Sequence, residues 1–212
     1  ASLGAAVDTA ASTGITPVWV AAKNGHVDVI KTLASLGAAV DTAESTGATP
    51  VFIAAQNGHV DAIKTLASLG AAVDTAASTG ATPVWVAAAN SHVDVIKTLV
   101  SLGAAVDTAA STGATPVWVA AANGHVGVIK TLYKLGADLG RAVLYDGVMH
   151  SALEVAEEYD QPTAIELIRG ILSKIESECE CCGSSTKKLS LCSRCQKVRY
   201  CSRECQVKDH KK

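Results

Sequence analysis

The residues of this chain that are best suited to chemistry are its seven cysteines, which all lie between Cys179 and Cys205. A thiolate can attack an electrophile, form a disulfide or bind a metal ion. A secreted disulfide scaffold would distribute cysteines through the fold, whereas closely spaced pairs are typical of a metal site in a reducing compartment. The cysteines therefore predict a metal centre near residue 190 and an intracellular protein, with the nucleus and the cytoplasm both open.

The spacing of the cysteines favours zinc. Six of them form the pattern C-x2-C-x9-C-x2-C-x5-C-x3-C, namely Cys179, Cys182, Cys192, Cys195, Cys201 and Cys205. Two cysteines that flank two residues can direct both sulfurs at one ion, and zinc prefers four nitrogen or sulfur ligands in a tetrahedron. Six ligands exceed what one ion needs, so a second site is implied. We take Cys181 as the spare cysteine, and the alternative is that Cys182 is the spare.

Basic residues are interleaved with these cysteines and could indicate nucleic-acid binding. A simpler interpretation is that they offset the negative charge of a zinc ion bound by four thiolates. No groove-reading helix and no stacking aromatic residues accompany them, so we do not expect nucleic acid as a partner. The residues concerned are Lys187, Lys188, Arg194, Lys197, Arg199 and Arg203.

This spacing, together with Tyr200-Cys201-Ser202 and Cys205-Gln206, resembles the MYND zinc finger over residues 179–212. The resemblance implies two interleaved zinc ions and a preference for short proline-containing peptides. It assigns one ion to Cys179, Cys182, Cys201 and Cys205, and it assigns Cys192 and Cys195 to the start of the second site. In the family a later His and Cys complete that second site, but the chain stops at Lys212, and His210 falls where the family usually has Trp. We therefore expect a finger that is incomplete at its C-terminus and holds close to one zinc ion.

A repeat of 33 residues organises the chain before the finger. The segment GITPVWVAAKNGHVDVIKTLASLGAAVDTAEST, which begins at Gly14, recurs with few changes from Gly47, Gly80 and Gly113. Residues 1–13 match the end of this unit, so the chain opens within a repeat and both of its ends look truncated. A degenerate fifth copy follows, with three residues inserted in the loop from Leu144 to His150.

Each unit is expected to form two helices and an extended connector. Thr16 is a suitable N-cap and Pro17 suits the first helical position, because its missing N–H has no helical partner there in any case. The first helix should end near Lys23, and a second should run from His26 until Gly37 ends it. One such unit cannot bury its apolar face, so the units must stack.

The repeat resembles the ankyrin repeat over residues 1–172. The resemblance rests on the period and on Thr16-Pro17, Ala21-Ala22, Asn24-Gly25-His26 and Leu36-Gly37-Ala38. It implies an all-α fold, an ankyrin-repeat solenoid followed by a small zinc-stabilised finger. The expected divisions are a partial repeat at 1–13, full repeats at 14–46, 47–79, 80–112 and 113–145, a capping repeat at 146–172, a helical linker at 173–178 and the finger at 179–212. The family's turn Asp is replaced by Ala11, Glu44, Ala77 and Ala110, which predicts looser turns.

Two series of side chains recur with the repeat. His26, His59, His92 and His125 could form a ladder of metal ligands, but we interpret them as hydrogen-bonded side chains that place the turn before each second helix. The second series is aromatic and consists of Trp19, Phe52, Trp85 and Trp118. These side chains could stack a ligand, but we interpret them as packing between repeats because they belong to the buried helix face.

Differences among the near-identical repeats are the only clue to a partner surface. Ankyrin partners, by resemblance, lie across the connector tips and the inner surface of the first helices. Our candidate partner-binding residues are the ones that vary in these regions, namely Ile15, Lys23, Gln56 and Ala89. The alternative explanation of their variation is neutral drift of surface positions.

These features favour a non-enzymatic adaptor in which solenoid and finger bind different proteins. Residues 1–173 carry 8 basic and 15 acidic side chains and residues 174–212 carry 10 and 5, so the two parts differ in charge. No nucleophile–base set, phosphate loop or membrane-spanning run is present, and we expect neither a small-molecule substrate nor a membrane partner. The alternatives are the targeting portion of a larger enzyme such as a methyltransferase, and a transcriptional co-regulator that reaches DNA through partners.

Overall fold

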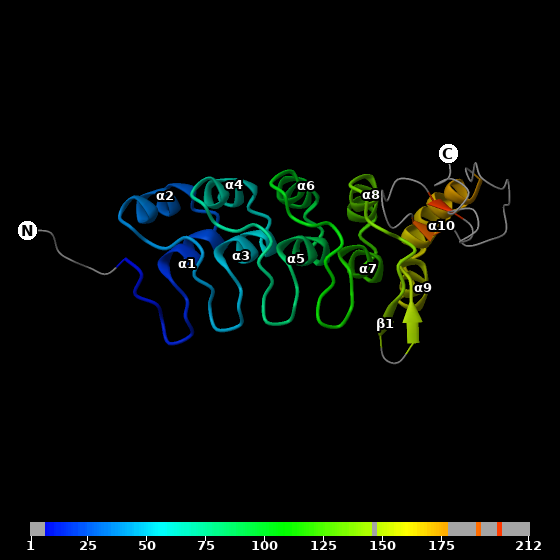
Figure 1. Cartoon of the computed structure of the whole chain (residues 1–212), viewed down its shortest axis with the longest axis horizontal. Helices are drawn as coiled ribbons and strands as arrows, with labels where there is room; N and C mark the ends of the chain where they lie inside the picture. The colour runs from blue at the N-terminus through cyan, green and yellow to red at the C-terminus, as the bar shows by residue number, and fades with distance from the viewer. Residues whose placement is uncertain (1–6, 146–147, 178–189, 192–198, 201–212) are drawn as a thin grey trace, which may run out of the picture.

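The computed structural model describes residues 7–145, 148–177, 190–191 and 199–200. Within these residues, ten helices stack as five successive pairs, with the connectors projecting to one side (Figure 1). The first helices are α1 (Pro17–Lys23), α3 (Pro50–Gln56), α5 (Pro83–Ala89), α7 (Pro116–Ala122) and α9 (Ala152–Glu158). The second helices are α2 (Val27–Ser35), α4 (Val60–Ser68), α6 (Val93–Ser101), α8 (Val126–Lys134) and α10 (Pro162–Ser177). The stack confirms the expected ankyrin-type solenoid.

The first helices begin where the sequence predicts. The Thr16 hydroxyl accepts a hydrogen bond from the Trp19 backbone N–H at 3.2 Å, and Pro17 occupies the first turn. Thr49, Thr82 and Thr115 cap α3, α5 and α7 in the same way. Each of these threonines is buried, so its hydroxyl also needs this partner to offset its loss of water.

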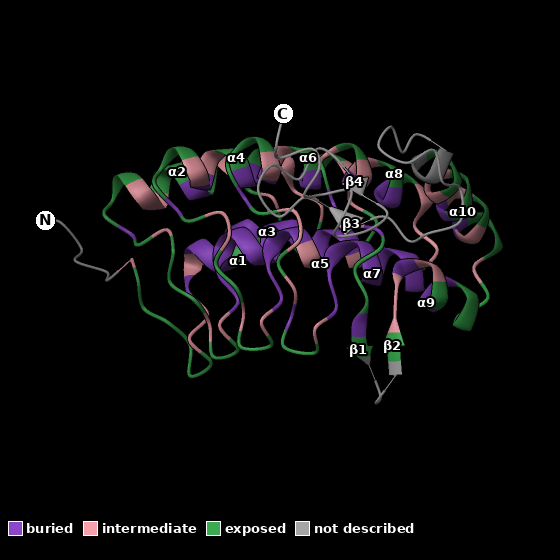
Figure 2. Ribbon diagram, turned by 45° about the vertical axis from the view of Figure 1, so that its right-hand side comes forward, coloured by how far each residue is buried: buried purple, intermediate pink, exposed green. Residues whose placement is uncertain are grey.

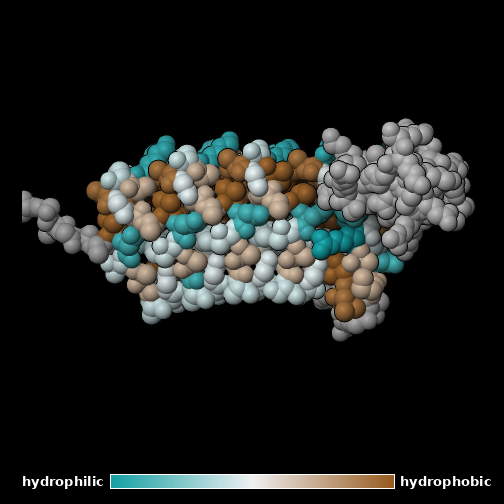
Figure 3. All heavy atoms as spheres, in the orientation of Figure 1, coloured by the Kyte–Doolittle hydropathy of each residue, from teal (hydrophilic) through white to brown (hydrophobic). Residues whose placement is uncertain are grey.

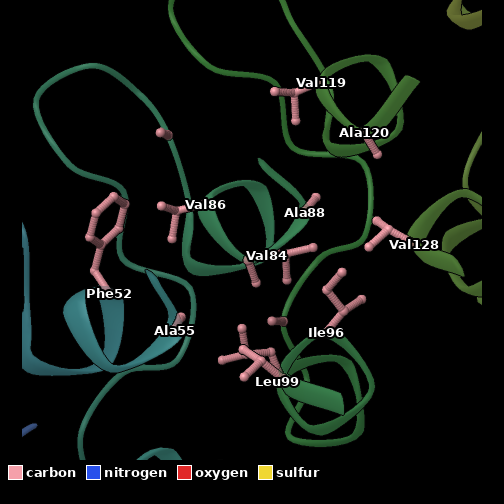
Figure 4. Close-up of a cluster of buried hydrophobic side chains, with 14 of the residues drawn as sticks. Phe52, Ala55, Val84, Val86, Ala88, Ile96, Leu99, Val119, Ala120 and Val128 are labelled. Carbon is pink, nitrogen blue, oxygen red and sulfur yellow. The ribbon is translucent and has the colours of Figure 1, made fainter. Parts of the chain in front are cut away.

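The core lies between the two rows of helices and continues from repeat to repeat (Figure 2). In Figure 4, Ile96 and Leu99 of α6 point toward Val84 of α5, and Val128 of α8 points toward Ile96 from the next repeat. Alanines such as Ala88 line the first helices, and their small side chains let neighbouring helices approach closely. The core is therefore a series of thin layers that neighbouring repeats complete.

The connectors are closed by backbone hydrogen bonds, so the looser turns predicted from the sequence are not observed. In the second connector the Glu44 N–H donates to the Ala48 carbonyl at 3.1 Å and the Gly47 N–H donates to the Glu44 carbonyl at 2.8 Å. The Ser45 N–H donates to Thr13 in the preceding connector. Backbone bonds of this kind are independent of the side chain that replaces the family's Asp.

A ladder of aspartates joins each connector to the next repeat. The carboxylates of Asp8, Asp41, Asp74 and Asp107 accept hydrogen bonds of 2.9–3.1 Å from the backbone N–H of Ala39, Ala72, Ala105 and Asp138, which each lie 31 residues further along the chain. These bonds give a partner to a backbone donor just after each second helix, and they fix the register between neighbouring repeats.

A β-hairpin replaces the last connector. Strands β1 (Val143–Tyr145) and β2 (Val148–His150) pair antiparallel, with Val143 opposite His150 and Leu144 opposite Met149. Val143 is buried against Gly113 in the connector that precedes α7. The three residues inserted here thus extend the connector into paired strands, where the sequence predicted only a loop.

The capping pair α9 and α10 covers the last full repeat. Ser151 and Glu154 form a reciprocal capping box at the start of α9, and Ala164 and Ile168 of α10 are fully buried. α10 is a single helix that contains both the second helix of the fifth repeat and residues 173–177. The finger thus follows directly on a helix of the solenoid.

One turn between paired helices is strained. Gly25, Gly58 and Gly124 occupy the same turn position and have φ values of +69°, +80° and +68°, whereas repeat three has Ser91 there at φ +65°. Left-handed backbone disfavours a residue with a Cβ atom by about 1–2 kcal/mol. At Gly58, moreover, a Cβ would lie 2.9 Å from the His92 ring.

We predict that Ser91→Gly raises the free energy of unfolding by about 1 kcal/mol, because it removes this backbone strain. Urea unfolding followed by circular dichroism measures the change. Ser101→Gly, at the end of α6 in the same repeat, is the matched control and should lower stability, because glycine weakens a helix. Equal effects of the two substitutions would contradict the explanation.

Asp107 yields a prediction about pH. Burial of its carboxyl group, together with the nearby Asp138 carboxylate, raises its pKa above the ordinary value of 3.8, although the hydrogen bond from the Asp138 N–H acts in the opposite direction. The folded state therefore binds a proton more readily than the unfolded state, so this group's contribution to stability is present below about pH 3.8 and is lost as pH rises through the raised pKa.

Asp107→Asn keeps an acceptor oxygen and removes the charge. The free energy of unfolding of this variant minus that of the parent chain should be larger at about pH 7 than at about pH 3, where the parent carboxyl is protonated. Asp41→Asn, at the exposed equivalent position, is the control and should show a smaller dependence on pH. A larger dependence for Asp41→Asn would show that burial of Asp107 is not the cause.

Candidate functional site

The recurring histidines join neighbouring repeats. Nε2 of His59 lies 2.9 Å from the Lys23 carbonyl oxygen, and Nε2 of His92 lies 3.0 Å from that of Gln56. His125 makes the same contact with Ala89 at 3.0 Å. Because a carbonyl can only accept, each Nε2 carries the proton and donates it. These contacts confirm the interpretation of His59, His92 and His125 as hydrogen-bonded turn residues, and they place the partner in the preceding repeat.

The aromatic series also packs between repeats. Trp19, Phe52 and Trp118 are buried, and Trp85 is half-buried. The indole N–H of Trp19 donates to the Ala48 carbonyl at 3.1 Å, and that of Trp85 donates to the Ala114 carbonyl at 3.0 Å, each in the following connector. Packing between repeats, predicted for this series, is confirmed.

Three of the candidate partner-binding residues form one row along the solenoid. Lys23, Gln56 and Ala89 are the last residues of α1, α3 and α5. Their backbone carbonyls accept the histidine hydrogen bonds, while the side chains of Lys23 and Gln56 are exposed and that of Ala89 is half-buried. The equivalent Ala122 is buried at the end of α7. The row thus has a fixed backbone, and the available side chains become smaller and less polar toward the cap.

Ile15 does not belong to this row. It precedes the N-cap of α1, whereas Lys23 is at the other end of the same helix, about 10 Å away at 1.5 Å per residue. Its side chain is half-buried and packs against the core. The structure therefore separates Ile15 from the three residues with which the sequence grouped it.

Charge is sparse on this side of the described solenoid. The Lys23 ammonium lies 5.7 Å from the centre of the Trp19 ring, close enough for a cation–π contact. On the second connector, a hydrogen bond from the Thr46 hydroxyl lowers the pKa of Glu44, so this carboxylate is ionised at neutral pH. Lys23 and Glu44 thus offer a partner charges of both signs within the first two repeats.

The hairpin contributes two exposed apolar residues that sequence reasoning missed. Leu144 and Met149 face each other across β1 and β2, and more than half of each side chain is exposed. Figure 3 shows a hydrophobic patch at the hairpin, beside the row of connectors. The signal was present in the sequence, because Asp146-Gly147 between Val143-Leu144-Tyr145 and Val148-Met149 is typical of a two-residue hairpin turn.

The candidate zinc ligands Cys179, Cys182, Cys192, Cys195, Cys201 and Cys205 all lie outside the described residues, as do Cys181 and His210. In this segment the structure describes β3 (Ser190–Leu191) and β4 (Arg199–Tyr200), which pair antiparallel. Cys192 and Cys195 fall in the chain between these strands, and Cys201 follows β4 directly. The donor set of thiolates in pairs fits zinc.

The described part of the chain was also compared with the requirements of a metal site and of a membrane-spanning helix. Among those residues no group of three or more His, Cys, Asp or Glu side chains could hold a metal ion. None of the helices described there is long and apolar enough to cross a membrane.

Comparison with known families agrees with this architecture. The model for ankyrin repeats in three copies matches residues 2–77 and 70–142, and the model for the MYND finger matches residues 179–212. No curated protein matches the chain. Ankyrin repeats and MYND fingers are typically non-catalytic modules that bind other proteins, and the MYND finger is a zinc-binding family. The chain belongs to the ankyrin-repeat family and carries a MYND finger after its repeats.

Proposed function

We propose that this protein is an adaptor in which the solenoid binds one protein and the finger binds another. The observation that carries the proposal is the pairing of two interaction modules in one chain, with α10 leading from the solenoid toward the finger. An excess of acidic side chains in residues 1–173 and of basic side chains in residues 174–212 would favour partners of different charge.

On the solenoid, the proposed contact surface is the row of Lys23, Gln56 and Ala89 together with the hairpin residues Leu144 and Met149. The row varies at positions whose backbone is held by inter-repeat hydrogen bonds, so its side chains can change without altering the stack. The exposed apolar pair supplies hydrophobic contact area that the row lacks.

For the finger, we propose zinc as the structural ion and a short proline-containing peptide as the ligand. Four thiolates from Cys179, Cys182, Cys201 and Cys205 would hold one ion, and Cys192 with Cys195 would begin a second site. When bound, zinc supplies folding free energy and no redox chemistry. Because thiolate ligands persist in reducing surroundings, we also propose an intracellular location.

A two-variant comparison tests the adaptor. Lys23→Glu with Gln56→Glu should reduce capture of solenoid partners at least tenfold in cross-linking mass spectrometry, because it changes exposed side chains and leaves the core intact. Lys31→Glu with Lys64→Gln, on the exposed side of the second helices, gives the same change in charge and is the control. Cys201→Ser should remove a different set of partners. Loss of the same partners in the Lys23→Glu, Gln56→Glu variant and in the Cys201→Ser variant would contradict a two-site adaptor.

Metal content gives a second test. The purified chain should hold close to one tightly bound zinc ion, and Cys179→Ser or Cys201→Ser should abolish it, because three thiolates leave the site open to water. Cys181→Ser is the matched control and should retain the ion, and Cys192→Ser should change the content little. A chelator should leave the helical circular dichroism of the solenoid intact, because no cysteine lies in the first 178 residues. Two tightly bound ions, or loss of helix on chelation, would contradict these assignments.

A further inference from the structure

An asparagine follows the first helix of each full repeat as its C-cap. The backbone torsion angles of these four residues agree closely, with φ between −104° and −91° and ψ between 0° and 13°. All four residues are exposed, namely Asn24, Asn57, Asn90 and Asn123. Because backbone and access to water are alike, any difference in their chemistry comes from side-chain contacts and from the residue that follows.

The residue that follows an asparagine controls whether its side chain can cyclise. When glycine follows, its backbone nitrogen can attack the Cγ atom of the asparagine amide, because no Cβ atom hinders the close approach. Glycine follows the asparagine in repeats one, two and four, whereas Ser91 follows Asn90 in repeat three. Three of the four positions thus have the sequence that favours this reaction.

The side-chain amide is held differently in the fourth repeat. In the first three repeats Nδ2 donates at 2.8 Å to a carbonyl of the same helix, that of Val20, Ile53 or Val86. Nδ2 of Asn123 instead lies 3.4 Å from the Ala89 carbonyl oxygen in the preceding repeat. Hydrogen bonds of this kind are usually about 2.7–3.2 Å long, and the same carbonyl accepts a shorter bond of 3.0 Å from Nε2 of His125. The Asn123 amide is therefore the most weakly held of the four.

The attacking nitrogen is held alike in all four repeats. The N–H of the residue after each asparagine donates to the carbonyl three positions earlier, at 3.1–3.4 Å. Breaking this bond is a barrier that the four positions share. The short bond from the side-chain amide adds a second barrier in the first three repeats, because Cγ cannot turn toward the nitrogen until Nδ2 leaves the helix carbonyl.

We propose that Asn123 is a site of spontaneous deamidation and isoaspartate formation. The Gly124 nitrogen bonds to Cγ of Asn123, the Cγ–Nδ2 bond breaks, and the amino group leaves as ammonia with the Gly124 N–H proton. Water then opens the resulting five-membered succinimide at either carbonyl, which gives aspartate or isoaspartate. No atom is oxidised or reduced, and water is the co-reactant. The proposal does not depend on the adaptor function.

The product would loosen the joint between the third repeat, the fourth repeat and the cap. Isoaspartate adds one carbon to the main chain just before Gly124, where a Cβ atom would already overlap the Gln161 side chain of the capping repeat. A carboxylate at position 123 also has no hydrogen to donate to the Ala89 carbonyl. We therefore expect the isoaspartate form to unfold at a lower temperature than the parent chain.

Incubation of the Ser91→Gly chain at neutral pH and physiological temperature is the test, with peptide mapping by mass spectrometry as the readout. This substitution gives Asn90 and Asn123 the same flanking sequence, Ala-Ala-Ala-Asn-Gly-His, so that the fold alone distinguishes them. Because the net free energy of one hydrogen bond is modest, Asn123 should deamidate about threefold to tenfold faster than Asn90 and Asn57. In concentrated urea, Asn90 and Asn123 should deamidate at equal rates.

A second measurement follows stability during the same incubation. Ageing should lower the melting temperature of the parent chain, and it should have a smaller effect on Asn123→Gln, because the longer glutamine side chain does not readily form the five-membered ring. Equal rates at Asn90 and Asn123 in the folded chain would overturn the proposal. So would a rate difference that persists in urea, or an equal loss of stability in the Asn123→Gln chain.

Discussion

Each repeat can bury its apolar side chains only against its neighbours, and the rest of the structure follows from this constraint. Two helices of seven and nine residues enclose no core of their own, so stability depends on how well adjacent layers fit. The stacking register is fixed by polar contacts at three places around the interface. These are the histidine at the tight turn, the tryptophan beside the connector and the aspartate after the second helix.

At the ends of the first helices, the backbone serves stability and the side chains are free to serve recognition. The carbonyls of Lys23 and Gln56 hold the next repeat in place, while their side chains extend into solvent. The part of the residue that the stack requires is thus common to all amino acids, and the part that a partner would contact can differ. The same logic explains why near-identical repeats differ at the ends of the first helices.

The features that depend on contacts within a few residues could be predicted from the sequence. Thr16, Pro17 and Gly37 determine helix starts and ends through contacts within a few residues, and the 33-residue period requires stacking. Bonds between repeats could not be assigned, because the partners of Asp41 and His59 lie 31 and 36 residues away and depend on the stacking register. Ile15 was grouped with Lys23 because both vary, but a helix separates them. The hairpin was predictable from Asp146-Gly147, but the repeat pattern indicates only a three-residue insertion there, which an ordinary loop would also accommodate.

The length of α10 bears on how one ligand could engage both modules. Its 16 residues span about 24 Å at 1.5 Å per residue, and the helix ends at Ser177, two positions before the first candidate zinc ligand. A helix packed on the cap through Ala164 and Ile168 is a stiff spacer, unlike a flexible tether. A bivalent ligand would gain avidity only if its own linker could reach both of its sites, since effective concentration falls to near zero when a linker is too short. The spacing between two motifs in a ligand would then be selected as strictly as the motifs themselves.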